Sequence, residues 1–225
     1  MGTFKINSAY SAQPSLVKPN PFLPVAIEYI FKNGLISKVP SKIRVADQGC
    51  GKLRHLKLLT QYFDHIYLID TEFQLSRPQK LFGKSDITIK GYVDTLNIHG
   101  KEISVVSDVS FNSTRLNLDI VFNICVFDIE IPKVRKAISD SAYRNLMKGG
   151  LCIIIISRND QSILSRCKKE NKYLDGYAFC HHGTVTFYKN YLDTQPLIKN
   201  LARQGFKLIG DLSVYKQVCL ITRKE

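Results

Sequence analysis

A short glycine turn, Asp47-Gln48-Gly49-Cys50-Gly51, most constrains the fold, because it stands between a strand pattern and a helix pattern. The strand is predicted over residues 43–47, and the buried face of the helix is marked by Leu53, Leu56, Leu59, Tyr62 and Phe63. Glycines at positions 49 and 51 permit a sharp turn and the close approach of a ligand that a Cβ atom would exclude. This order of strand, turn and helix is typical of nucleotide-binding α/β proteins.

The alternation of strands and helices continues along the chain, which favours a largely parallel sheet with right-handed crossovers. The further strands are predicted over residues 66–70, 103–106, 118–126, 151–157 and 184–188. Helices are predicted over residues 22–31, 132–147 and 191–204, and the last two strands, 206–212 and 217–222, are close enough to form an antiparallel hairpin. Residues 74–100 are ambiguous, with a helix and a short strand pair around 87–93 as the expectation.

The first 21 residues differ from the rest because they are polar and interrupted by prolines. We therefore expect residues 1–21 to form an extended N-terminal arm or lid, and residues 22–225 to form one domain. Arms of this kind can close over a ligand.

The carboxylate of Asp70, in addition to that of Asp47, supports a nucleotide site at the glycine turn. Asp70 ends the next predicted strand, 19 residues after Gly51, where α/β folds place the acid that accepts hydrogen bonds from both ribose hydroxyls. The dinucleotide fingerprint G-x-G-x-x-G is incomplete, because Arg54 stands at its third glycine. A dehydrogenase is disfavoured, while another nucleotide-binding α/β protein stays an alternative.

Residues 43–157 resemble the class I S-adenosylmethionine-dependent methyltransferases. The segment 47–51 looks like their first motif, D/E-x-G-x-G, although no third glycine follows Gly51. Tyr67-Leu68-Ile69-Asp70 and Val105-Val106-Ser107-Asp108 look like the second and third motifs, and residues 119–128 look like the fourth. The segment 146–151, Leu-Met-Lys-Gly-Gly-Leu, is similar to the usual turn before the fifth strand.

The resemblance implies an α/β fold: a Rossmann-like three-layer sandwich whose seven-stranded, mostly parallel sheet ends in an antiparallel hairpin. It implies S-adenosyl-L-methionine as cofactor, with Asp70 on the ribose and Asp108 near the adenine. The residues implied to bind the cofactor are Asp47, Gly49, Cys50, Gly51, Asp70, Thr71, Asp108, Val109 and Asn123. Asn123 and Asp128 are the candidate catalytic residues, because the end of the fourth strand faces the sulfonium in the resembling family.

The implied function is a methyltransferase that acts on an unidentified acceptor, either nucleic acid or a small molecule. A non-catalytic cofactor- or nucleic-acid-binding module on the same fold is the alternative. Residues 123–126 lack the paired prolines with which DNA amino-methyltransferases hold a flipped base, and no cysteine follows a proline as in cytosine-C5 enzymes. These standard nucleic-acid chemistries are therefore disfavoured.

Charge is the one unusual feature of the composition. The chain has 32 Lys and Arg against 19 Asp and Glu, a net charge of +13, which favours a polyanionic partner such as nucleic acid. The candidate contact face lies around Arg166, Lys168, Lys169 and Lys172.

The six cysteines show no C-x-x-C pair, and neighbouring His181 and His182 would point to opposite faces of a strand, so no metal site is expected. Without a long apolar run or a signal sequence, we expect a cytoplasmic protein with no membrane partner.

Overall fold

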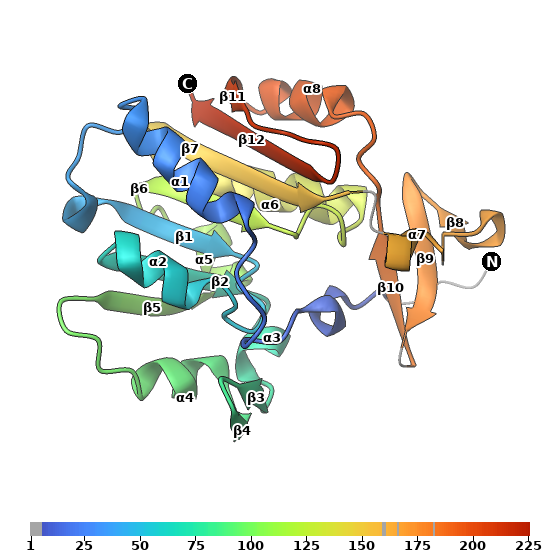
Figure 1. The fold of residues 1–225 in the computed structure, drawn as a ribbon, viewed down its shortest axis with the longest axis horizontal. Helices are drawn as coiled ribbons and strands as arrows, with labels where there is room; N and C mark the ends of the chain where they lie inside the picture. Colours follow the sequence, from blue (N-terminus) through green and yellow to red (C-terminus); the bar gives the residue numbers. More distant parts are fainter. Residues whose placement is uncertain (1–5, 159–160, 166, 182) are drawn as a thin grey trace.

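The computed structural model describes residues 6–158, 161–165, 167–181 and 183–225, and its centre is a seven-stranded sheet (Figure 1). In spatial order the strands are β11 (Phe206–Asp211), β12 (Gln217–Lys224), β7 (Leu146–Ser157), β6 (Leu118–Ile124), β1 (Arg44–Gln48), β2 (His65–Asp70) and β5 (Glu102–Ser107). The strands from β7 to β5 are all parallel, and β12 runs antiparallel to both β7 and β11. The predicted sheet and its final hairpin are confirmed, and the antiparallel β12 excludes the all-parallel sheet of dehydrogenases.

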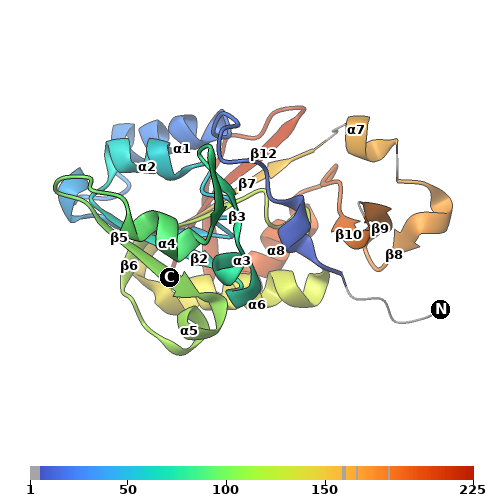
Figure 2. The same cartoon turned by 90° about the horizontal axis from the view of Figure 1, so that it is seen from below.

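Helices cover both faces of the sheet, which gives the three layers (Figures 1 and 2). One face carries α1 (Phe22–Lys32) and α2 (Leu56–Tyr62), and the other carries α5 (Asp108–Ser113), α6 (Pro132–Asn145) and α8 (Gln195–Arg203). Each face has its own hydrophobic core, because alternate residues of a strand point to opposite sides. Every residue of β6 is buried, as the apolar pattern predicted for a central strand.

The two largest differences from the predicted boundaries are at the start of β7 and the start of α8. Helix α6 ends at Asn145 and β7 begins at Leu146, so Lys148-Gly149-Gly150 belongs to the strand instead of a turn. The register between β6 and β7 shifts there, and Gly149 has a φ of +79°. Helix α8 begins four residues later than predicted, because Tyr191 is buried in the core instead of starting a helix.

The ambiguous segment after β2 contains two short helices and a small hairpin. These are α3 (Glu72–Ser76), β3 (Gln79–Leu81), β4 (Lys84–Ile87) and α4 (Ile89–Asp94). The strand pair therefore lies earlier than residues 87–93, which mostly form α4. Thr88 determines this boundary, since its hydroxyl accepts a hydrogen bond from the Gly91 N–H and caps the helix.

A second small sheet is inserted between β7 and α8. It consists of β8 (Lys172–Tyr173), β9 (Gly176–His181) and β10 (Thr184–Tyr188), preceded by α7 (Gln161–Leu164) and the 3₁₀ turn η3 (Lys169–Asn171). Strand β10 was predicted, whereas β8 and β9 were not. Two further 3₁₀ turns lie at Ser8–Ser11 (η1) and Pro40–Lys42 (η2). Among the described residues, no helix is long and apolar enough to cross a membrane.

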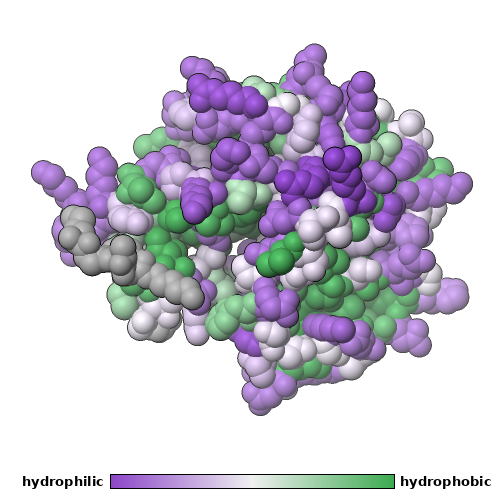
Figure 3. Space-filling view, turned by 180° about the vertical axis from the view of Figure 1, so that it is seen from behind, coloured by the Kyte–Doolittle hydropathy of each residue, from purple (hydrophilic) through white to green (hydrophobic). Residues whose placement is uncertain are grey.

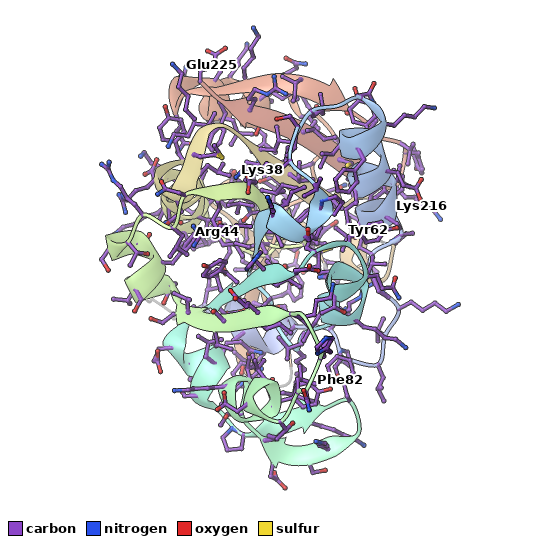
Figure 4. All side chains as sticks on the ribbon, turned by 90° about the vertical axis from the view of Figure 1, so that its left-hand side faces the viewer. Lys38, Arg44, Tyr62, Phe82, Lys216 and Glu225 are labelled. Atoms are coloured by element: carbon purple, nitrogen blue, oxygen red, sulfur yellow. The ribbon has the colours of Figure 1, made fainter. Side chains whose placement is uncertain are left out.

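Asp119, the first residue of the segment that resembles the fourth motif, stabilises the edge of the sheet at which the parallel strands begin. Its carboxylate pairs with the Lys38 ammonium at 2.7 Å and accepts a hydrogen bond from the Arg44 backbone N–H at 2.9 Å (Figure 4). Asp119 is thus structural, and any site that uses the carboxyl ends of the strands lies at the opposite edge.

Candidate functional site

The glycine turn after β1 has the backbone conformation that its sequence predicts. Gly49 has a φ of +84° and Gly51 a φ of +56°, both in the left-handed region that favours glycine. The N–H groups of Gly49 and Cys50 both donate to the Ile69 carbonyl, which fixes the turn to the end of β2. A Cβ atom on Gly49 would lie 2.4 Å from Val126 Cγ2, so the turn also packs closely on the loop after β6.

Leu53 occupies the position where the resembling motif can have a third glycine. It has a φ of +62° and is fully buried. The backbone therefore enters the left-handed region there without a glycine, at a cost of about 1–2 kcal/mol. Burial of the leucine side chain offsets this cost, since it contributes about 1.5–3 kcal/mol. The missing glycine does not prevent the turn.

Asp70 places a carboxylate directly against the turn. Its Oδ2 atom accepts a hydrogen bond from the Gly51 N–H and its Oδ1 atom accepts one from the Thr71 N–H, both at 2.8 Å. Burial raises the pKa of Asp70 to about 6, partly opposed by these two hydrogen bonds. Repulsion by the negative charges of Asp47 and Asp108 contributes to this increase. At neutral pH the carboxylate is ionised and can accept hydrogen bonds from a ligand.

Asp47 and His55 form a buried pair behind the turn. The His55 Nδ1 atom lies 3.7 Å from Asp47 Oδ2, beyond hydrogen-bond distance. Neither Asp47 oxygen nor the His55 Nε2 atom has a hydrogen-bond partner among the residues that the structure describes. Such orphaned groups are costly when buried, so their presence beside the turn indicates a place where a ligand or water completes the site.

A cavity of about 160 Å³ lies at the carboxyl ends of β1, β2 and β6. Its walls are the glycine turn, the ends of β2 and β5, the loop after β6, one face of α6 and the N-terminal arm. The predicted residues that line it are Gly49, Cys50, Gly51, Asp70, Thr71 and Asp108. Ligands of α/β sheets bind in this position, outside the carboxyl ends of the strands.

Four predicted site residues do not line this cavity. Asp47 and Asn123 are fully buried behind it, and the Asn123 amide donates to Cys152 Sγ at 3.6 Å. Asp128 is 4% exposed, with its carbonyl accepting a hydrogen bond from the Lys189 N–H. Val109 is 70% exposed on the outer surface of α5.

Glu130 lines the cavity although no sequence motif marked it. Its pKa is raised to about 7, mainly by burial and in part by the charge of Asp70, while the Ser8 hydroxyl and Arg135 favour the charged form. A carboxylate whose pKa is near neutrality can accept and release a proton under ordinary conditions. No sequence pattern marks Glu130, because it lies in the loop between β6 and α6 and reaches the cavity only through tertiary packing.

The N-terminal arm covers the site, as Figure 1 shows where it passes the ends of β1 and β2 toward β10. The Arg77 guanidinium donates to the Ala9 carbonyl at 2.9 Å and lies 5.0 Å from the centre of the Tyr10 ring. The Asn7 N–H donates to the Val185 carbonyl at 3.0 Å, so the arm also contacts the small sheet. Residues 8–13 contribute five of the cavity-lining residues: Ser8, Ala9, Ser11, Ala12 and Gln13.

The predicted basic face and the histidine pair lie apart from this cavity or outside the described residues. Lys168, Lys169 and Lys172 are exposed around η3 and β8, whereas Arg166 and His182 lie outside the residues that the structure describes. In the described part of the chain, no group of three His, Cys, Asp or Glu side chains is placed to hold a metal ion.

Comparisons with known proteins agree with this arrangement. No protein-family model matches the chain. The uncharacterised protein YmfD of Escherichia coli K12 is 25% identical over 211 residues, which cover 92% of this chain and 87% of that protein.

Among solved structures, the chain is similar to an S-adenosylmethionine-dependent methyltransferase of Methanosarcina mazei. The TM-score is 0.62 at 13% identity, over 92% of this chain and 99% of that one. It is also similar to the magnesium protoporphyrin IX methyltransferase of Synechocystis, determined with bound S-adenosylhomocysteine. That comparison has a TM-score of 0.57 at 14% identity, over 90% of this chain and 81% of that one. The strand order and these likenesses show that the chain has the class I S-adenosylmethionine-dependent methyltransferase fold.

Proposed function

We propose that the chain is an S-adenosylmethionine-dependent methyltransferase. The observation that carries this proposal is the partly buried Asp70 carboxylate beside the Gly49–Gly51 turn, at the carboxyl ends of β1 and β2. A ribose presents two neighbouring hydroxyl donors, which an ionised carboxylate can accept together. Structural neighbours determined with S-adenosylhomocysteine or sinefungin support the same choice of ligand.

The residues present fit this cofactor in three respects. The two glycines leave backbone exposed where a ligand must approach closely, and Gly51 has only the Ala12 methyl group of the arm within 3.4 Å of its missing Cβ. Asp70 accepts from hydroxyls, and Asp108, which also lines the cavity, is a candidate acceptor for the adenine amine. The orphaned Nε2 atom of His55 offers one further polar contact. When bound, the cofactor supplies a methyl group on a sulfonium.

The acceptor side of the site depends on Glu130 in this proposal. Its carboxylate holds or releases a proton near neutral pH and lines the same cavity as Asp70, so it can take the proton that a hydroxyl or amine acceptor loses. The earlier candidates Asn123 and Asp128 are buried beside the loop that carries Glu130. We propose that they act by positioning this loop, since neither lines the cavity.

Methyl transfer is tested with tritiated S-adenosylmethionine and separate pools of RNA, DNA, protein and small molecules. Transfer to one pool, lost in the Asp70→Ala variant, supports the proposal and identifies the acceptor class. Cofactor binding without transfer to any pool would instead favour the alternative, a non-catalytic binding module on the same fold.

Residues 1–21 are proposed to act as a lid over the cofactor. Arg77→Ala removes the guanidinium that holds the Ala9 carbonyl and packs on Tyr10 and Phe73. We expect the variant to release S-adenosylhomocysteine several-fold faster in stopped-flow displacement, because opening of the arm precedes release. Lys80→Ala, an exposed change on the nearby strand β3, serves as control. Equal release rates in Arg77→Ala and the wild type would contradict the lid.

The raised pKa of Glu130 predicts a pH-dependent stability. The folded chain binds this proton more tightly than the unfolded chain, whose Glu pKa is near 4.5. The stability of the fold therefore falls as the pH rises from about 4.5, and the full loss is reached above about pH 7. Glu130→Gln is expected to stabilise the chain by on the order of 1–3 kcal/mol at pH 8, which is several degrees in the unfolding midpoint. The gain should fade between pH 7 and 4.5 and vanish below.

Thermal unfolding of both chains from pH 4 to pH 8 measures this difference. Asp70 and Arg135 face the same carboxyl group and are kept unchanged in both. A difference that does not depend on pH would mean that the substitution acts through packing and not through the ionisation of Glu130.

A further inference from the structure

A second, much larger cavity lies on the other side of α6. It is a groove of about 1010 Å³ lined by residues of α6 and α8. These two helices lie on the sheet face opposite to α1 and α2 (Figure 2). Val134 and Ile138 of α6 line the cofactor cavity, whereas Arg135 and Ser139 of the same helix line this groove. The two cavities therefore share a helix but present different surfaces.

The groove is strongly basic. Eight of its lining residues are cationic and three are acidic, and the cations are Arg115, Arg135, Lys136, Arg144, Lys148, Lys189, Arg203 and Lys224. Figure 3 looks onto this face, where the most hydrophilic side chains gather in the upper half of the view. An excess of this size gives the groove a positive potential that concentrates anions.

The acidic residues neutralise only one part of the groove. Asp175 pairs with Arg135 and, at 2.8 Å, with Lys189, while Asp140 pairs with Lys136 at 2.6 Å. Within the residues that the structure describes, the remaining five cations have no carboxylate within ion-pair distance: Arg115, Arg144, Lys148, Arg203 and Lys224.

Two of these remaining cations, Lys224 and Arg115, lie close enough to repel one another. The Lys224 ammonium donates to the carbonyls of Tyr143 and Leu146 and lies 4.6 Å from the centre of the Tyr143 ring. Burial lowers the pKa of Lys224, and the charge of Arg115 lowers it further. Repulsion of this kind destabilises the unbound chain, and an anion bound in the groove would relieve it.

We propose that this groove binds the phosphate backbone of single-stranded nucleic acid without sequence preference. Five unneutralised cations, contributed by α6, α8 and three other segments, suit a repeating polyanion better than a single small anion. The proposal does not depend on methyl transfer or on cofactor binding. It places the contact in the groove instead of the segment around Lys168, Lys169 and Lys172.

Fluorescence anisotropy with a labelled oligouridylate of about 20 nucleotides, and with the matching oligothymidylate, tests the groove. The test variant is Lys148→Ala/Arg203→Ala, since both side chains are exposed and neither holds backbone in the described structure. Its matched control, Lys32→Ala/Lys57→Ala, removes the same charge from α1 and α2 on the opposite face.

We expect the groove variant to bind at least tenfold more weakly at low salt. The slope of log affinity against log salt should become shallower by about 0.7 for each lost phosphate contact. The control should retain the wild-type affinity and slope, and circular dichroism establishes that all variants are folded. Similar affinity for the two probes is expected, because the proposed contact is to the phosphate backbone.

Three results would overturn the proposal. Equal weakening in the groove and control variants would mean that binding follows net charge alone. Weakening only in a Lys168→Ala/Lys169→Ala variant would place the contact on the η3 segment. Absence of binding to both oligonucleotides at low salt would mean that the groove does not bind single-stranded nucleic acid. Because none of these assays contains cofactor, their failure would not affect the proposed methyltransferase activity.

Discussion

Asp70→Ala is expected to weaken the binding of S-adenosylhomocysteine at least tenfold. The substitution removes the carboxylate that accepts from the Gly51 N–H and that we propose accepts from the ribose hydroxyls. Each hydrogen bond to a charged group contributes about 1.5–3 kcal/mol, so the loss of two more than accounts for a tenfold change. Isothermal titration calorimetry at pH 7.5 measures the affinity.

Two further variants separate the role of charge from that of folding. Asp70→Asn keeps an acceptor oxygen without the charge and should lie between the wild type and Asp70→Ala. Asp94→Ala removes an exposed carboxylate from α4, away from the cavity, and should bind as the wild type does. Unchanged affinity in Asp70→Ala would contradict the assignment of the ribose contact.

Gly49→Ala is expected to have the largest effect on stability. The new Cβ atom would lie 2.4 Å from Val126 Cγ2, and the residue would have to keep a φ of +84°. Overpacking of this kind costs about 1–3 kcal/mol and the left-handed conformation about 1–2 kcal/mol more. Since the turn also carries the Gly51 N–H that contacts Asp70, cofactor affinity should fall with stability.

Gly34→Ala is the matched control for this prediction. Gly34 has a φ of +58°, but no atom lies within 4 Å of its missing Cβ, so this change tests backbone strain without overlap. Chemical denaturation should show a free energy of unfolding that is reduced by about 1–2 kcal/mol in the control and by more in Gly49→Ala. Equal losses would mean that contact with Val126 does not constrain the turn.

The sheet could be predicted from the sequence because its signals are local. The continuous apolar run of β6 indicates a buried strand by itself, and the glycines after β1 indicate a sharp turn by themselves. Neither inference needs information about the rest of the chain. The hairpin β3–β4 and strand β8 were missed or misplaced because these strands are two to four residues long, and β4 and β8 are mostly exposed. Strand β9 was missed because the residues that it buries, Gly176 and Ala178, are small. Such strands lack the alternating apolar pattern on which the prediction relies.

Some residues of the candidate site could be predicted from local sequence signals, and others could not. Asp70 and the turn could be predicted because they follow strands directly, and their separation along the chain is fixed by one crossover. Glu130 could not be predicted, since its contact with the cavity arises from the loop after β6 and from Ser8 of the arm, far away in the sequence. Asn123 follows the strand pattern, but its side chain lies on the buried side facing Cys152.

The cavity at the carboxyl ends of β1 and β2 is expected to bind S-adenosylmethionine. Calorimetric titration of the wild-type chain with S-adenosylhomocysteine, and separately with NAD, measures this binding. We expect one S-adenosylhomocysteine site for each chain, abolished or weakened at least tenfold by Asp70→Ala, and no comparable affinity for NAD. Tighter binding of NAD, or no heat of binding with either ligand, would contradict the assignment of this cavity to S-adenosylmethionine.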